Sequence, residues 1–271
     1  LAFPIQSLMI AVAVGTAVGI NAFLSRTLGE KDFEKANIIA RNGIFIAIAS
    51  YIGFAVVGAL ISRPFFASQT EVLEVREYGV TYLTICCVAG MGIFLQTTFE
   101  RLLQATGKTM YTMITQSTGA IINIILDPIL IFGLDMGVQG AALATVISQG
   151  LSAAWVMKFL TGKKAILRLS KRAMHLEWKL VKEIIFLGTS GFVMSVTNGL
   201  VQIVCNATVQ RYGGDIYVGI MTVINSVREI VTMPVTGLTA ASQPVIGYNY
   251  GAGCYQRVKS AIRFTAVGCI V

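Results

Sequence analysis

Charged residues are scarce in this sequence: Asp, Glu, Lys and Arg make up 13% of its 271 residues. A typical soluble domain carries about 25% charged residues, so the composition excludes an ordinary soluble fold. Histidine occurs once, at His175, and a single imidazole cannot anchor a metal centre. The five cysteines show no CxxC spacing, which favours packing roles over metal binding or redox chemistry.

The motifs of several functional classes are also missing. The sequence has no paired acids or metal cluster of the kind that a membrane-embedded transferase needs, so we expect no enzymatic activity and no cofactor. It offers no candidate for a pore loop or a ring of charges, which argues against an ion channel.

Apolar segments dominate what is present. Hydrophobic residues make up 55% of the chain and the mean hydropathy is +0.73. A helix needs about 20 apolar residues to cross a bilayer. Runs of that length predict an all-α, polytopic membrane protein with about seven complete spans and the start of an eighth near 262. The seven runs lie at 4–24, 42–62, 79–99, 110–133, 137–160, 184–210 and 217–248.

Lys and Arg are distributed unevenly between the two sets of predicted loops. One set holds 17 of them, whereas the other holds Arg63, Arg76 and Arg211. The positive-inside rule therefore predicts that the basic side is cytoplasmic, in a cell membrane. The basic loop 161–182 is expected to be a solvated cytoplasmic linker, with contact to anionic lipid headgroups as the alternative. The net charge of +8 then requires no nucleic-acid partner.

One predicted span contains Asn123 and Asp127, four residues apart and followed by Pro128. This spacing places both side chains on one helical face. Pro128 cannot donate a hydrogen bond to the Ile124 carbonyl, which predicts a bend and a free carbonyl oxygen nearby. A carboxylate within a membrane is costly, so Asp127 is a candidate coupling-ion site. The alternative is a structural role near the end of its span.

Weak internal similarity appears when the chain is compared with itself at an offset of 222 residues. The offset pairs Asn21 with Gln243 and Gly29 with Gly251, and it covers six spans. Two parallel bundles of six helices follow from such a repeat. We expect an amino-terminal bundle at 1–160 that lacks its first helix, the linker 161–182, and the start of a carboxy-terminal bundle at 183–271.

Four motifs resemble the multidrug and toxic compound extrusion (MATE) transporters, and the resemblance covers essentially the whole chain. The motifs are Glu100-Arg-Leu-Leu-Gln-Ala-Thr-Gly107, Asn123-Ile-Ile-Leu-Asp127-Pro-Ile-Leu-Ile-Phe-Gly133, Gly137-Val-Gln-Gly-Ala-Ala-Leu-Ala-Thr145 and Ser242-Gln-Pro-Val-Ile-Gly-Tyr-Asn-Tyr-Gly-Ala252. The chain opens on Leu1 and its last apolar run stops at Val271. We therefore expect a fragment that extends from about the second helix into the ninth of twelve.

The resemblance implies a secondary active transporter that exports drug-like, often cationic compounds in exchange for H⁺ or Na⁺. It implies that Asn123, Asp127 and Thr145 bind the coupling cation, and that the protein acts on small molecules in a lipid bilayer, as a monomer. A lipid or lipid-linked oligosaccharide flippase of the same superfamily is the alternative; it would be expected to hold pyrophosphate with several Arg or Lys.

Three further polar residues fall within predicted spans. Some members of the family use an acid in the middle of the seventh helix to bind the ion. This chain carries Asn198 at that position, which favours Asp127 over an ion site in the carboxy-terminal bundle. Arg228 and Glu229 are interpreted either as a local structural pair or as residues of a substrate cavity or gate. Glu100 and Arg101, at the cytoplasmic end of their span, are interpreted either as side chains that snorkel to the interface or as an interfacial pair.

Overall fold

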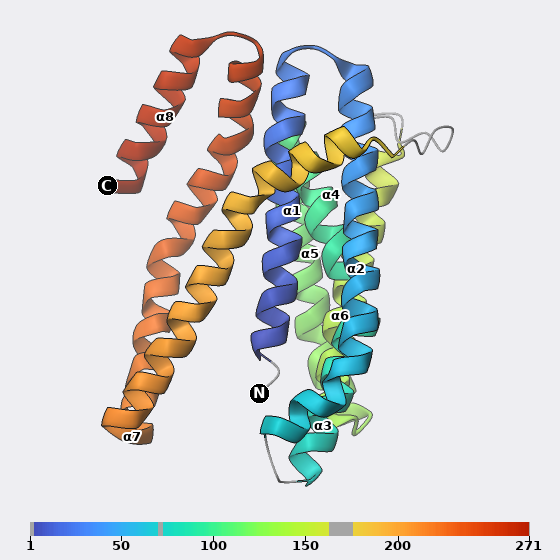
Figure 1. Ribbon diagram of the computed structural model, residues 1–271, viewed down its shortest axis with the longest axis vertical. Helices are drawn as coiled ribbons and strands as arrows, with labels where there is room; N and C mark the ends of the chain where they lie inside the picture. Colours follow the sequence, from blue (N-terminus) through green and yellow to red (C-terminus); the bar gives the residue numbers. More distant parts are fainter. Residues whose placement is uncertain (1–2, 70–72, 163–175, 271) are drawn as a thin grey trace.

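The computed structural model describes residues 3–69, 73–162 and 176–270, and these residues form helices joined by short turns, with no strand among them (Figure 1). The elements in chain order are α1 (Phe3–Gly29), α2 (Phe33–Gln69), α3 (Leu73–Val88), α4 (Met91–Ala105), α5 (Thr109–Pro128), the π-helix η1 (Ile129–Gly133), α6 (Gly137–Leu160), α7 (Trp178–Gly251) and α8 (Tyr255–Ile270). The predicted all-α class is confirmed.

Five helices in the described part of the chain are long and apolar enough to cross a membrane. A sixth is obtained if α3 and α4, which meet at an angle of 42°, together form one span. The sequence predicts one span at 79–99, and the break at Gly90 divides this segment between α3 and α4. A side-chain carbon at Gly90 would overlap the Cys86 carbonyl oxygen, which explains why the tight bend uses glycine there.

The element α7 consists of two helices that meet at Gly214, where the backbone has φ 71°. Glycine tolerates this left-handed conformation because it has no Cβ atom. The chain reverses direction there, and the two halves of α7 run side by side toward opposite ends of the molecule (Figure 1). The helix also begins at Trp178, so the last residues of the predicted linker loop are helical. Residues 163–175 of that loop lie outside the described residues.

The apolar core lies where α1, α2, α4, α6 and the first turns of α7 meet. Its most deeply buried members are large aliphatic side chains, including Ile20, Leu24, Ile39, Leu102 and Ile184, each 0% exposed. Without water on either side, close packing rather than the hydrophobic effect holds such helices together. The α1 helix is central because it packs against α2, α4 and both halves of α7.

Small residues allow α1 to approach α7 closely. A side-chain carbon at Gly19 would overlap the Ile184 carbonyl oxygen, and one at Gly188 would overlap the Gly15 carbonyl oxygen. Contacts of this kind are typical of helix pairs in membranes. They fix the crossing of α1 with the first half of α7.

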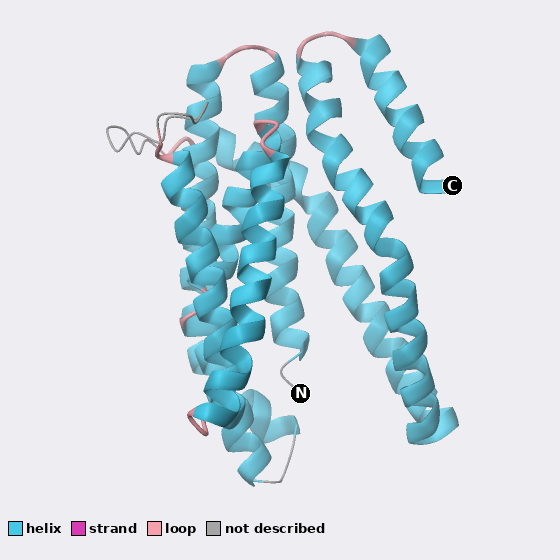
Figure 2. Cartoon of the chain, turned by 180° about the vertical axis from the view of Figure 1, so that it is seen from behind, coloured by secondary structure: helices cyan, strands magenta, loops and turns pink. Residues whose placement is uncertain are grey.

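The turns at 30–32 and 252–254 lie together at one end of the molecule, which we call the basic end (Figure 2). It includes Lys31 at a left-handed position, and the Asp32 carboxylate caps α2 by accepting a hydrogen bond from the Lys35 amide at 3.0 Å. The turn at Gly214 lies at the opposite end (Figure 1).

Candidate functional site

The predicted cation-binding pair lies where α5 gives way to the π-helix. Asn123 donates a hydrogen bond to Oδ1 of Asp127 at 3.5 Å, as their spacing on one helical face requires, and both side chains are half-buried. After Pro128 the backbone hydrogen bonds span five residues instead of the four of an α-helix. The Leu134 amide donates to the Ile129 carbonyl at 2.9 Å. Such π-helical turns are frequent at functional sites. The carboxylate is therefore held at an irregular end of α5.

Thr145 lies across from this pair on α6 and is also half-buried. Its hydroxyl donates to the Ala141 carbonyl at 3.0 Å, which leaves the oxygen's lone pairs free to accept or to coordinate. A cavity of about 250 Å³ between α4, α5 and α6 is lined by both Asn123 and Thr145. Asp127 is not among the residues that line it. The structure thus places Asn123 and Thr145 at one cavity. Asp127 lies outside its wall and is hydrogen-bonded to Asn123.

A polar cluster that sequence analysis missed lies on α1 and α3. The Gln6 amide donates to the Tyr82 hydroxyl at 3.2 Å and to the Cys86 thiol at 3.6 Å. Asp127 is close enough to Tyr82 for the two groups to interact electrostatically. Nothing in the separate motifs signalled this, because the residues are 76 and 80 positions apart in the chain.

Glu100 occupies a different place from the one predicted. Neither snorkelling nor an interfacial pair describes Glu100, because it is only 6% exposed and forms no ion pair within the described residues. Its carboxylate accepts hydrogen bonds from Gln96 and Gln116, each at 3.0 Å. The Arg101 guanidinium instead donates to Gln104 at 2.9 Å.

Arg101 lines a larger cavity of about 610 Å³ between α1, α4, α7 and α8. The rest of its wall is mostly small or hydroxyl-bearing, with Ser190, Ser195, Thr236 and Thr239 among its members. Among the described lining residues, Arg101 is the one that carries a charge. The volume lies within the range of about 300–1,000 Å³ that suits drug-sized ligands.

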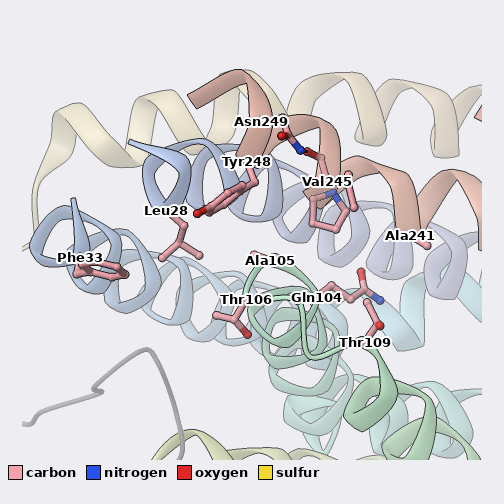
Figure 3. A pocket seen from close by; sticks show the side chains of 12 residues that line it. Leu28, Phe33, Gln104, Ala105, Thr106, Thr109, Ala241, Val245, Tyr248 and Asn249 are labelled. Carbon is pink, nitrogen blue, oxygen red and sulfur yellow. Dashed lines mark hydrogen bonds between the residues drawn. The ribbon is translucent and has the colours of Figure 1, made fainter. Parts of the chain in front are cut away.

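A third cavity, of about 580 Å³, opens at the basic end between the α4–α5 turn and the end of α7 (Figure 3). Tyr248 and Asn249 approach it from α7, while Gln104 and Thr106 lie across from them on the other side of the gap. Leu28 of α1 completes one wall. This cavity lies beside the place where α1 and α7 meet.

The remaining predicted residues lie apart from these cavities. Asn198, Arg228 and Glu229 have exposed side chains on α7, and none of them is among the residues that line the cavities described above. Arg228 and Glu229 form no salt bridge in the described part of the chain, which gives no support to the structural pair. Their role in a cavity or gate stays a prediction.

No group of three His, Cys, Asp or Glu side chains within residues 3–69, 73–162 and 176–270 is arranged to hold a metal ion. The candidate site is instead built from amide, hydroxyl and single carboxylate groups. A multi-pass helical bundle with polar cavities between its helices is the architecture of a membrane transport protein.

The sequence matches the MatE family over residues 1–129 and 191–270, and the chain belongs to this family. It is 29% identical over 277 aligned positions to a multidrug export protein MepA of Staphylococcus haemolyticus, an alignment that covers 100% of this chain and 60% of that protein. It is 28% identical to MepA of Staphylococcus aureus strain MSSA476 over 97% of this chain and 58% of that protein. The chain thus spans somewhat more than half the length of these relatives, which are transport proteins rather than enzymes.

Solved structures have the same fold. The structure described as MATE in complex with MaL6 superposes with a TM-score of 0.93 at 23% identity, over 97% of this chain and 59% of that one. An outward-facing multidrug resistance MATE transporter of the MOP superfamily superposes with a TM-score of 0.91 at 22% identity, over 97% and 59%. These likenesses confirm the predicted fold of a polytopic helical membrane protein.

Proposed function

We propose that this chain is the larger part of a secondary active efflux transporter that exchanges drug-like, often cationic compounds for H⁺ or Na⁺. The observation that carries the proposal is the half-buried Asp127, which accepts a hydrogen bond from Asn123, a residue that lines a cavity together with Thr145. An ion can drive export only if it binds one state of the protein better than the other. An intramembrane carboxylate with oxygen-bearing neighbours is suited to that task.

Relatives named as multidrug export proteins support the transport of varied small molecules. The cavity of about 610 Å³ between α1, α4, α7 and α8 is large enough for such compounds, and its wall is mostly small or hydroxyl-bearing with Arg101 as its charged residue. In this proposal the two bundles rock around that cavity, with residues 1–160 in one bundle and 183–271 in the other. The basic end faces the cytoplasm of the cell membrane, following the Lys and Arg asymmetry.

A lipid-linked oligosaccharide flippase is the less favoured alternative. Holding a pyrophosphate calls for several cationic side chains. Arg101 is the one cation among the described lining residues of the cavity of about 610 Å³. The relatives named above are export proteins for drugs. Both observations favour drug efflux.

The test uses the full-length protein that contains this chain, reconstituted in liposomes. We expect the fluorescent cation ethidium to move against its gradient when a proton or sodium gradient is imposed in the opposite direction. Proteoliposomes in which ethidium only equilibrates, whatever the ion gradient, would contradict the proposed exchange.

A further inference from the structure

Within the described residues, no cation pairs with the buried carboxylate of Glu100. It lies in α4 with 6% of its surface exposed, and both of its oxygens accept an amide hydrogen bond: Oε1 from Gln96 and Oε2 from Gln116, each at 3.0 Å. Burying an ionised carboxylate costs several kcal/mol unless a cation pairs with it or a proton neutralises it. Since a neutral side chain could fill this space at lower cost, the acid calls for a functional explanation.

The described residues of the neighbouring helices bring no compensating charge to this carboxylate. Arg101 is the charged group that interacts electrostatically with this carboxylate, but it belongs to α4 itself. Its guanidinium donates to Gln104 and lines the cavity of about 610 Å³. From α5 come the neutral Gln116 and Thr112, whose hydroxyl donates to the Glu100 carbonyl at 3.5 Å. No Lys, Arg or His forms an ion pair with Glu100 within the described residues.

The two glutamines connect Glu100 to the cavity that Asn123 and Thr145 line. Gln96 and Gln116 are both part of the cavity wall, whereas Glu100 lies behind them. At about 250 Å³ the cavity is below the range of about 300–1,000 Å³ for drug-sized ligands, but it can hold several waters of about 30 Å³ each. The cavity is therefore of a size for water and small ions rather than for the exported compound.

We infer that Glu100 is a second proton-exchange site, which communicates through this cavity with the Asn123–Asp127 pair. In the exchange, a proton adds to one carboxylate oxygen, and the facing glutamine turns its amide so that its carbonyl oxygen accepts the new O–H. The reverse step returns the proton to cavity water. The geometry suits a proton, because the carboxylate is buried and the amides of Gln96 and Gln116 can donate to its ionised form or accept from its protonated form.

This inference rests on the proposed ion-coupled efflux and adds a second acid to it. If protonation of Glu100 and binding of a cationic drug exclude one another, drug binding must release a proton from this site as well as from Asp127. The two acids then contribute separately to one measurable quantity, the number of protons released when drug binds.

The first experiment measures proton release on binding of ethidium to the purified full-length transporter, in weak buffer with a pH indicator. Glu100→Gln should lower the release by about half, Asp127→Asn should do the same, and the double variant should abolish it. Glu34→Gln, an exposed acid at the start of α2, is the matched control and should release as many protons as the wild type. Wild-type release from Glu100→Gln would overturn the inference and leave the proposed efflux intact.

A second measurement avoids substitution, in case Glu100→Gln does not fold. Dicyclohexylcarbodiimide reacts with protonated carboxyl groups in apolar surroundings, and mass spectrometry of the wild type locates the adduct. We expect Glu100 to be labelled at low pH and protected by ethidium. Labelling of Glu100 that ethidium does not change would overturn the inference, as would ethidium affinity that responds to sodium but not to pH. Failure of the wild type to bind ethidium would count against the proposed efflux itself.

Discussion

The side-chain amide of Asn21 in α1 donates a hydrogen bond to Oε1 of Gln243 in α7 at 3.2 Å, and the two residues are 222 positions apart. This separation is the offset at which the sequence repeats itself. Gly29 and Gly251, also 222 apart, make matching contacts: a side-chain carbon at Gly29 would overlap the Tyr248 carbonyl oxygen, and one at Gly251 would overlap the Arg26 carbonyl oxygen. Tyr248 is in turn the repeat counterpart of Arg26. A twofold axis between the two helices would generate such paired contacts.

These contacts hold α1 and α7 together at the basic end. The Arg26 guanidinium adds a further contact, 5.6 Å from the centre of the Tyr250 ring. Toward the opposite end, the hairpin formed by the two halves of α7 diverges from α1 (Figures 1 and 2). The two helices are therefore in close contact at the basic end, and an alternating-access cycle that opens the molecule between them would require the glycine contacts to separate.

A disulfide across this contact should stop transport reversibly. A side-chain carbon at Gly247 would lie 2.8 Å from Cβ of Ser25, so cysteines at these two positions can form a bridge after a small shift. We expect Ser25→Cys/Gly247→Cys to lose efflux on oxidation and to regain it with reductant. The single variants Ser25→Cys and Gly247→Cys are the controls. Undiminished efflux by a fully cross-linked sample would show that the basic end does not open during transport.

Asp127→Asn should abolish ion-driven efflux and leave protein abundance near that of the wild type. The change removes the negative charge but keeps the size of the side chain, so the loss would come from ion coupling rather than packing. Asp135→Asn is a matched control, because Asp135 is an exposed acid in the turn after the π-helix, at a left-handed position that asparagine tolerates. Growth of Asp127→Asn cells in drug at the wild-type limit would remove Asp127 from the mechanism.

The helical class and most helix positions could be predicted from the sequence because bilayer-length apolar runs admit few alternatives. The hydrogen bond between Asn123 and Asp127 was likewise predictable from their spacing within one helix. The site around Glu100 was not, because Gln116 belongs to another helix and reaches Glu100 across 16 positions of the chain. A charge near the end of an apolar run also does not reveal whether it faces lipid, water or the interior of the bundle. Only the packing of α4 against α5 and α6 decided that.

Close packing between α1 and α7 gives a prediction about stability. Gly19→Ala places a methyl group against the Ile184 carbonyl oxygen, and such overpacking typically costs about 1–3 kcal/mol. We expect a lower midpoint of thermal unfolding in detergent. Gly53→Ala is the control, because a side-chain carbon there has no neighbour within 4 Å and alanine favours a helix. Equal midpoints for the two variants would argue against a tight helix crossing at Gly19.

The orientation of the protein can be tested with single cysteines at the two ends of the bundle. Lys108 lies in an exposed turn at the end of α4, on the side rich in Lys and Arg, and Leu134 lies in the turn after the π-helix and is 63% exposed. In a cysteine-free background, an impermeant thiol reagent added to intact cells should label Leu134→Cys and spare Lys108→Cys. Inside-out vesicles should give the opposite pattern, which also controls for the reactivity of each cysteine. Because positive charge is retained on the cytoplasmic side during insertion, labelling of Lys108→Cys in intact cells would reverse the proposed orientation and, with it, the side of the membrane that the basic end faces.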